Sequence, residues 1–382
     1  MASPAVTLET EKRNILAKIF RQLFIPLLGI ITALIVGAII IFISGFSPLQ
    51  AYGGLWKGSF GDLEAINGTL ATATPYMFTA LAVVFAFRAG LFNIGAEGQI
   101  KIGAISAAWV GINVGGLPSF LAIPLTLAGG CLGGALWGAI PGALKAWSGA
   151  HEVITTIMLN YIATFITSWL VGADGPMKAP ARMSQSDQIG ENARIGTIVQ
   201  GQPLHWGLVI GVTMALTVWF ILYKTPLGLE IRTVGANPSA ARYAGINLKF
   251  ILLATMAIAG MLAGMAGSLE VMGSPGFRYR YNAALGSGYG FDSIAIALLA
   301  KNNPLAVIAA VILFGALKQG ASQMQFDTVA ADGRQLPGDL ILMIQALVIL
   351  FVAADQVLRW LYRIKAQGGE GVVLTRGWGK AE

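Results

Sequence analysis

The stretch KTPLGLEIRTVGANPSAARYAGINLKF, residues 224–250, is one long polar interval between two hydrophobic halves of nearly equal size. It contains one acid, Glu230, and four basic residues, Lys224, Arg232, Arg242 and Lys249. Cytoplasmic segments of membrane proteins carry an excess of Lys and Arg. We therefore expect this interval to face the cytoplasm and the rest of the chain to be organised around it.

A short helix is expected within this interval, over residues 238–243. Asn237 can cap free backbone N–H groups, and Pro238 is tolerated in a first helical turn. Gly245 can end the helix in a left-handed conformation. The alternative reading is an ordinary loop between two membrane spans.

Composition indicates a membrane protein. Of 382 residues, 55% are hydrophobic and only 11% are charged, which leaves too little polar surface for a soluble protein of this length. The formal net charge is +7, but the basic residues lie in short segments between helices and in the tail, where membrane orientation accounts for them. We expect no nucleic-acid partner, and the one cysteine, Cys131, allows no intrachain disulfide.

The hydrophobic runs predict an all-α polytopic membrane protein with about ten transmembrane helices and both termini cytoplasmic. The runs are 24–44, 70–87, 94–114, 120–144, 153–171, 206–223, 251–272, 289–300, 305–317 and 340–354. The apolar residues 293–300 are fewer than a bilayer requires, even with 289–292 added, so we expect a broken or re-entrant helix there. Spans two to five start from the outside and spans seven to ten from the inside, which allows an inverted repeat.

The same pattern predicts three regions. Residues 1–23 form a cytoplasmic segment with an interfacial helix, 24–358 form the transmembrane domain with 224–250 as its cytoplasmic loop, and 359–382 form a basic cytoplasmic tail. Two glycine stripes predict close helix packing, since small residues let helix backbones approach. They are Gly130, Gly134, Gly138 and Gly142, and Gly260, Gly264 and Gly267.

Polar side chains gather at membrane depth in three clusters, residues 92–99, 151–161 and 289–293. Each amide or acid alone could simply bond a neighbouring helix. Three clusters together favour a polar translocation pathway. The candidate pathway residues are Asn93, Glu97, Gln99, Glu152, Asn160, Tyr289, Phe291 and Asp292.

Enzyme motifs are missing from the sequence. It contains no G-x-x-x-x-G-K-[ST] phosphate-binding loop, and its two histidines, His151 and His205, form no H-E-x-x-H metal motif. We therefore expect no catalytic residues, no metal site and no ATP bound by this chain.

Four ordered stretches resemble the signature segments of ABC-importer permeases in the branched-chain amino acid, ribose and nucleoside group. They are FRAGLFNIGAEGQIKIGA (87–104), KAWSGAHEVITTIMLNYIA (145–163), RTVGANPSAARYAGI (232–246) and GYGFDSIAIALLAKNNP (288–304). The chain is most similar to the larger permease subunits of bacterial nucleoside importers, over about residues 24–355. It departs from the family at its extended ends and at His151, where an Asn is expected before the Glu-Val-Ile stretch.

The resemblance implies a subunit of the bacterial cytoplasmic membrane that pairs with a related but distinct second permease. A cytoplasmic ABC ATPase would bind ATP and Mg²⁺, and an extracytoplasmic binding protein would deliver the substrate. The short helix resembles a coupling helix that docks on the ATPase. Its candidate residues are Gly235, Asn237, Pro238, Ala241, Arg242, Tyr243 and Gly245.

For the cargo, we favour a nucleoside over a simple sugar such as ribose. The amides suit either ligand, whereas Tyr161, Tyr289 and Phe291 offer aromatic faces for a planar base. An ion-coupled secondary transporter is an alternative, with Glu97 or Asp292 binding a proton or cation. A membrane scaffold or receptor subunit would need no polar pathway, so the three clusters count against it.

Overall fold

The computed structural model describes residues 28–180, 184–273, 279–330, 332–353, 358 and 362–363. Within these residues the regular secondary structure consists of α-helices and one short 3-10 helix, and extended residues pair only in three isolated bridges. Six of the described helices are long and apolar enough to cross a membrane: α3 (Leu63–Arg88), α5 (Ser119–Ser148), α6 (Glu152–Leu170), α7 (Gly207–Lys224), α10 (Leu248–Gly273) and α12 (Pro304–Asp327). The predicted all-α membrane class is confirmed, whereas the interfacial helix in residues 1–23 and nearly all of the 359–382 tail lie outside the described residues.

The described residues form two compact units, one containing 28–58 and the described residues from 320 onward, and the other the described residues of 59–319. The first unit contains the apolar helix Leu28–Ile43, α2 (Pro48–Phe60) up to residue 58, the end of α12 (Pro304–Asp327) and α13 (Gly338–Ala353). Its core clusters Ile41, Phe46, Ala51, Met324, Leu336, Ile341 and Ile344. The Tyr52 hydroxyl donates to the Leu34 carbonyl at 2.7 Å, tying α2 to the first helix.

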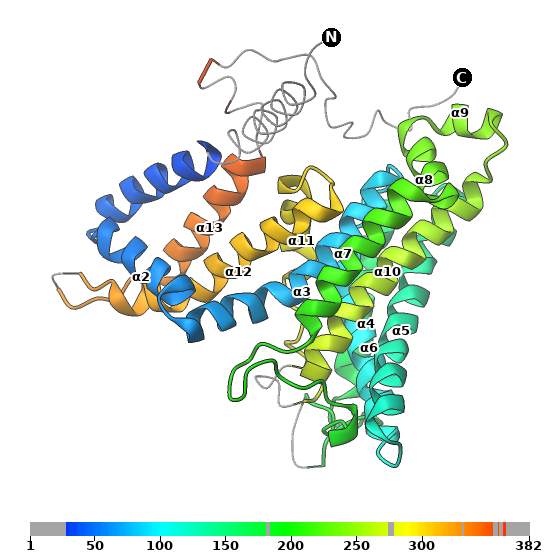
Figure 1. Ribbon diagram of the computed structural model, residues 1–382, viewed down its shortest axis with the longest axis horizontal. Helices are drawn as coiled ribbons and strands as arrows, with labels where there is room; N and C mark the ends of the chain where they lie inside the picture. The colour runs from blue at the N-terminus through cyan, green and yellow to red at the C-terminus, as the bar shows by residue number, and fades with distance from the viewer. Residues whose placement is uncertain are drawn as a thin grey trace, which may run out of the picture. The chain divides into compact units, whose positions relative to one another are not determined.

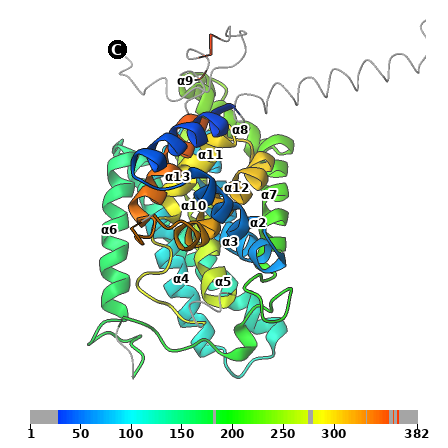
Figure 2. The ribbon, with the colours of Figure 1, turned by 90° about the vertical axis from the view of Figure 1, so that its left-hand side faces the viewer.

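The second unit is a helix bundle that contains the polar clusters. It includes α3 (Leu63–Arg88), α4 (Ala96–Asn113), α5 (Ser119–Ser148), α6 (Glu152–Leu170), α7 (Gly207–Lys224) and α10 (Leu248–Gly273). Figure 1 shows α4, α5 and α10 side by side, with α8 (Pro226–Ala236) and α9 (Pro238–Tyr243) at one end of the bundle and the described residues between α6 and α7 at the other. Helix α7 packs against α3. Figure 2 shows α6 and α7 on opposite sides of this bundle.

The two glycine stripes pack against each other. A Cβ on Gly134 would lie 2.2 Å from the Gly260 carbonyl oxygen, and one on Gly264 would lie 2.4 Å from the Gly130 oxygen. Such distances admit no side chain, so the backbones of α5 and α10 are in direct contact. Both predicted stripes are confirmed as packing surfaces. Gly260 and Gly264 face the α5 stripe, whereas Gly267 packs on α4, where its Cβ would lie 2.2 Å from the Ile100 carbonyl oxygen.

The predicted short helix over residues 238–243 is α9. The Asn237 side-chain oxygen accepts the backbone N–H groups of Ser239 and Ala240 at 3.0 and 3.1 Å, and Gly245 has φ +80°. The cap and the glycine stop are confirmed. A second helix was not predicted: α8 fills the start of the interval, with Thr225 capping Gly228 at 3.2 Å.

Helix α11 (Tyr289–Leu299) has 11 residues, which gives it a length of about 16 Å, half the thickness of a hydrocarbon core. The expected short helix is therefore present. By contrast, α12 runs for 24 residues, well past the predicted end at Leu317, and α3 begins seven residues before the predicted start at Leu70 because Asp62 caps the Ala65 N–H at 2.7 Å.

Candidate functional site

Glu97 connects two of the predicted polar clusters. It lies in the first turn of α4, and its carboxylate accepts the backbone N–H groups of Gly288 at 2.8 Å and Gly290 at 3.0 Å. These groups belong to the free N-terminus of α11, where a negative charge also stabilises the helix dipole. Gly290 is required for the approach, since its Cβ would lie 2.3 Å from the Glu97 nitrogen. The buried acid is thus the cap of the short helix.

Asn93 and Gln99 form an amide pair that closes the turn before α4. The Asn93 nitrogen donates to the Gln99 side-chain oxygen at 3.1 Å, and the Gln99 nitrogen donates back to the Asn93 oxygen at 3.3 Å. The Asn93 oxygen also accepts the Gly95 N–H at 2.9 Å. Both side chains are buried, so they support the start of α4 from within.

Asn160 joins the second cluster to the first. From α6, its side-chain oxygen accepts the Gly98 N–H at 2.8 Å and its nitrogen donates to the Ile94 carbonyl at 2.9 Å. One amide therefore satisfies two backbone groups at the start of α4. Lys101 adds a further link to α6, donating to the Thr164 hydroxyl at 3.1 Å.

Asp292 is the polar centre of the third cluster. Its carboxylate accepts the Tyr76 hydroxyl at 2.9 Å and pairs with the Lys318 ammonium at 3.1 Å. Tyr289 meets the Tyr76 ring edge to face, with centroids 4.9 Å apart. Phe291 is 50% exposed. Acidic, basic, hydroxyl and aromatic groups from α3, α11 and α12 therefore meet at one place in the bundle.

Glu270 belongs to this neighbourhood and was not predicted. It lies near the end of α10 with only 6% of its surface exposed, and it interacts electrostatically with Tyr289, as do Glu97 and Asp292. The sequence did contain a signal, since an acid inside the apolar run 251–272 is costly unless it has a role. Tyr76 and Lys318 were missed because a tyrosine or a lysine near the end of a span is common.

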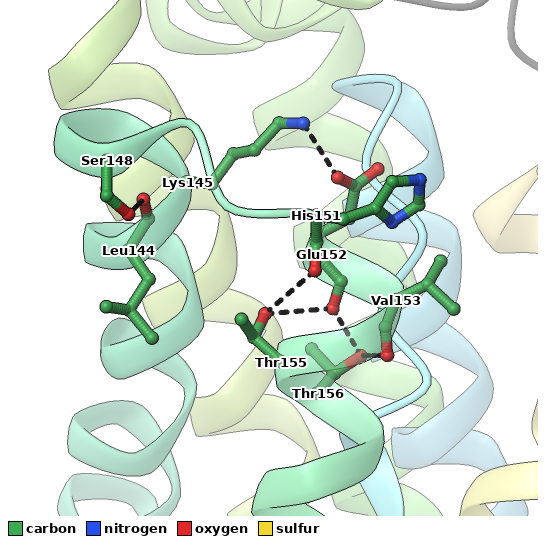
Figure 3. Close-up of polar contacts among 8 residues, drawn as sticks. All are labelled: Leu144, Lys145, Ser148, His151, Glu152, Val153, Thr155 and Thr156. Carbon is green, nitrogen blue, oxygen red and sulfur yellow. Dashed lines mark hydrogen bonds and ion pairs between the residues drawn. The ribbon is translucent and has the colours of Figure 1, made fainter.

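Glu152 lies apart from the other pathway candidates. It is in the first turn of α6 and pairs with Lys145 of α5 at 2.8 Å, with only 6% and 9% of the two side chains exposed. Figure 3 shows Lys145 reaching across the α5–α6 connection to the carboxylate, with the His151 ring beside it. His151 is exposed and its side chain makes no cap hydrogen bond to α6. This ion pair fastens the α5–α6 turn.

The aromatic residues proposed for base stacking are placed differently. Tyr161 is 61% exposed, on the α6 face that also exposes Ile154, Met158, Ile162, Phe165, Ile166 and Trp169. The opposite face of α6 buries Glu152, Thr156, Asn160, Ala163 and Thr167. Tyr161 thus lies on the outer face of the bundle, whereas Tyr289 lies in the polar neighbourhood.

The candidate coupling residues occupy a single corner. Arg242 and Tyr243 are exposed, Tyr243 to 94%, while Ala241 is buried beneath them. Asn237 and Pro238 form the junction of α8 and α9. Gly235 packs on the end of α3, where its Cβ would lie 2.2 Å from the Arg88 carbonyl oxygen. The corner therefore combines a rigid base with an exposed basic and aromatic tip.

Comparison with known proteins connects this geometry to transport. Residues 65–353 match the family model described as branched-chain amino acid transport system, permease component. The guanosine ABC transporter permease protein NupP of Bacillus subtilis is 37% identical over 92% of this chain and 99% of its own length. The nucleoside permease NupB of Lactococcus lactis is 35% identical over 88% and 92%. The glucose permease TsgB13 of Haloferax volcanii is 34% identical over 89% of each chain.

Two of these organisms also contain a more distant relative of this chain. The guanosine permease NupQ of Bacillus subtilis is 28% identical over 65% of this chain, and the nucleoside permease NupC of Lactococcus lactis is 28% identical over 72%. No solved protein structure matches the chain.

Proposed function

This chain belongs to the family of branched-chain amino acid transport system permease components, and we propose that it is the transmembrane subunit of an ATP-driven nucleoside importer. It is a multi-pass protein of the bacterial cytoplasmic membrane. The observation that carries the proposal is the α8–α9 corner, which is capped by Asn237 and exposes Arg242 and Tyr243. It belongs to the helix bundle that contains the three polar clusters, which make hydrogen bonds around the start of α4.

The α8–α9 corner is the proposed docking point for a cytoplasmic ABC ATPase. The helix has six residues, and its Asn237 cap satisfies two of its free N–H groups. The ATPase would bind ATP and Mg²⁺, and this chain would bind neither. ATP-driven closure of the ATPase would move α9 and the helices attached to it.

The pathway proposal divides the candidate residues into two groups. Tyr289, Phe291 and Asp292, with Glu270 added, form the proposed lining, because they gather charge, hydroxyl and aromatic surface. Asn93, Glu97, Gln99 and Asn160 form the proposed support, since each binds backbone or amide groups around α4. Glu152 is proposed to support the α5–α6 turn through Lys145.

The proposed assembly contains a second permease, a related but distinct chain, and an extracytoplasmic binding protein that delivers the nucleoside. The paired permeases of Bacillus subtilis and Lactococcus lactis support the second permease. The proposed topology has about ten passes, cytoplasmic termini and an inverted repeat of spans two to five and seven to ten. Its proposed regions are residues 1–23, 24–358 and 359–382.

Glucose or another sugar is the second candidate cargo. The observation in its favour is the 34% identity to a permease named for glucose, close to the identities with the nucleoside permeases. Aromatic faces such as Tyr289 can also hold a sugar ring, so identity alone separates the two cargoes poorly.

Uptake by the reconstituted complex with its cognate binding protein tests the cargo. Labelled adenosine, guanosine, uridine, ribose, glucose and a branched-chain amino acid are compared at equal concentration, with and without ATP. We expect ATP-dependent nucleoside uptake. Uptake of a sugar or an amino acid with no nucleoside uptake would overturn the cargo and leave the importer architecture in place.

A further inference from the structure

Arg88, the last residue of α3, lies where three parts of the second unit meet. Its Nε donates to the Asn302 backbone carbonyl at 2.8 Å, in the turn between α11 and α12. Its guanidinium carbon lies 5.4 Å from the centroid of the Tyr223 ring at the end of α7. The Arg88 backbone oxygen is the surface on which Gly235 of α8 packs. Arg88 thus contacts the end of α7, the end of α8 and the turn that follows α11.

The α8 contact is rigid on both sides. A Cβ added to Gly235 would lie 2.2 Å from the Arg88 carbonyl oxygen. A Cβ added to Gly90, which has φ +72°, would lie 3.3 Å from the Gly235 Cα. Only Asn237 separates α8 from α9. A displacement of α9 therefore moves α8, and α8 cannot approach its base further without displacing the end of α3.

The α11 contact holds a turn with unusual backbone geometry. Lys301 and Asn302 have φ of +50° and +54°, a conformation that costs non-glycine residues on the order of 1 kcal/mol or more and persists where surrounding contacts enforce it. The Asn302 N–H bonds to the Ala297 carbonyl at 2.9 Å, and its own carbonyl is bound by Arg88. Arg88 thus holds one end of α11 while Glu97 caps the other.

We infer that Arg88 is a positioning residue that transmits movement of the ATPase-docking corner α8–α9 to α11, the helix that bears Tyr289 and Asp292. This inference rests on the proposed function. Arg88 touches no substrate. It acts by keeping the α11–α12 turn and the base of α8 in a fixed relation, so that both move together when nucleotide binds to the ATPase.

The test compares Arg88→Lys with Arg232→Lys in the complete complex. Arg232 lies over the same Tyr223 ring, 5.2 Å from its centroid, but its Nε donates to the Gly228 carbonyl within its own helix. Both substitutions keep the positive charge, and only the first removes the bond to Asn302. Spin labels at exposed Leu229 and Ser287, in a chain with Cys131 replaced, report the distance between α8 and the start of α11 with and without ATP.

In the labelled parent we expect the same distance with and without ATP, because α8 and α11 move together. In Arg88→Lys we expect normal assembly with the ATPase, a distance that changes when ATP is added, and nucleoside uptake per ATP hydrolysed reduced on the order of tenfold, within the usual range of coupling between sites. Arg232→Lys should behave as the parent. If Arg88→Lys does not assemble, Gly235→Ala takes its place in the test. Its added Cβ forces α8 away from the Arg88 carbonyl oxygen, and it should show the result expected of Arg88→Lys. The inference would be overturned if Arg88→Lys or Gly235→Ala kept the label distance and the uptake per ATP hydrolysed of the parent. It would also be overturned if Arg232→Lys lost as much uptake per ATP hydrolysed as Arg88→Lys. A parent complex that keeps the label distance when ATP is added but imports no nucleoside overturns only the cargo.

Discussion

The Glu97 carboxylate accepts the Gly290 N–H at 3.0 Å, across nearly two hundred residues of sequence. Glu97, which the sequence suggested as a residue of the transport pathway, therefore caps the short helix α11. A secondary transporter would need this carboxylate free to bind a proton or cation. Its two backbone partners favour a supporting role, and the charge at the α11 N-terminus is compensated by the helix dipole.

Glu97→Ala should destabilise the protein more than Glu97→Gln. Alanine leaves the N–H groups of Gly288 and Gly290 without an acceptor at a buried site, at a cost of about 1 to 3 kcal/mol for each group. Glutamine keeps an acceptor for one of the two N–H groups; it loses the second acceptor and the charge, the charge being worth about 0.3 to 2 kcal/mol at a helix terminus. The midpoint of thermal unfolding in detergent measures both. Equal midpoints for the two variants would argue against capping.

Cysteine accessibility separates the lining residues from the supporting ones. In a chain with Cys131 replaced by Ala, Phe291→Cys should react with an aqueous maleimide in at least one nucleotide state, because half of the Phe291 surface is exposed. Asn93→Cys and Gln99→Cys should stay unreactive, since both positions are buried. Protection of position 291 in every state would remove Phe291 from the pathway.

Arg242→Glu should weaken docking of the ATPase without preventing membrane insertion. Arg242 is exposed on α9, and reversing one charge of an interface opposes like charges. Substrate-stimulated ATPase activity of the reconstituted complex measures the effect. Wild-type stimulation in this variant would contradict the coupling role of α9.

Gly245→Val should have the same effect for a different reason. Gly245 has φ +80° with no atom near the position of an added Cβ, so the cost is backbone strain alone, about 1 to 2 kcal/mol. Gly245→Asn is the matched control, because asparagine tolerates the left-handed conformation. We expect reduced ATPase stimulation in the valine variant and near-normal stimulation in the asparagine variant. If both lose stimulation equally, the glycine is needed for contact and not for its conformation.

Lys145→Ala should destabilise the α5–α6 turn by about 3 to 5 kcal/mol, the cost of leaving a buried charge without its partner. The exchanged pair Lys145→Glu with Glu152→Lys should recover part of that loss, because it restores opposite charges. Ser148→Ala, in the same turn, removes only a hydroxyl that bonds within its own helix and is the control. A double-mutant cycle compares the unfolding midpoints of the parent, Lys145→Ala, Glu152→Ala and the double alanine variant, and additive effects would show that the pair contributes nothing.

Stability should fall in mild acid because of His205. Burial lowers the pKa of His205 from 6.5 to about 4, and its Nδ1 accepts the Gly207 N–H at 3.1 Å. Between these values the unfolded chain binds a proton that the folded chain does not. Stability is complete above pH 6.5 and decreases toward pH 4, by up to about 3 kcal/mol. His205→Gln should show a flatter dependence of unfolding midpoint on pH; an unchanged slope would exclude His205 as the cause.

The sequence by itself determined the class and most of the local structure. Long apolar runs require helices in a membrane, since each backbone polar group must be satisfied within its own segment. The cap at Asn237, the stop at Gly245 and the short length of α11 follow from side-chain and backbone chemistry within a few residues. Such features depend on neighbours in the chain, so a single sequence contains the information.

Only the tertiary structure decided which polar residues hold the helices in place and which are free to line the proposed translocation pathway. Asn160 and Gly98, or Glu97 and Gly290, are partners through bonds to backbone N–H groups, and a backbone N–H is the same at every residue, so no side-chain pattern marks it. Arg88 and Asn302 meet in the same way, through a backbone carbonyl. The sequence shows where a polar side chain within a membrane span costs free energy, and the packing of the helices determines what each such side chain binds.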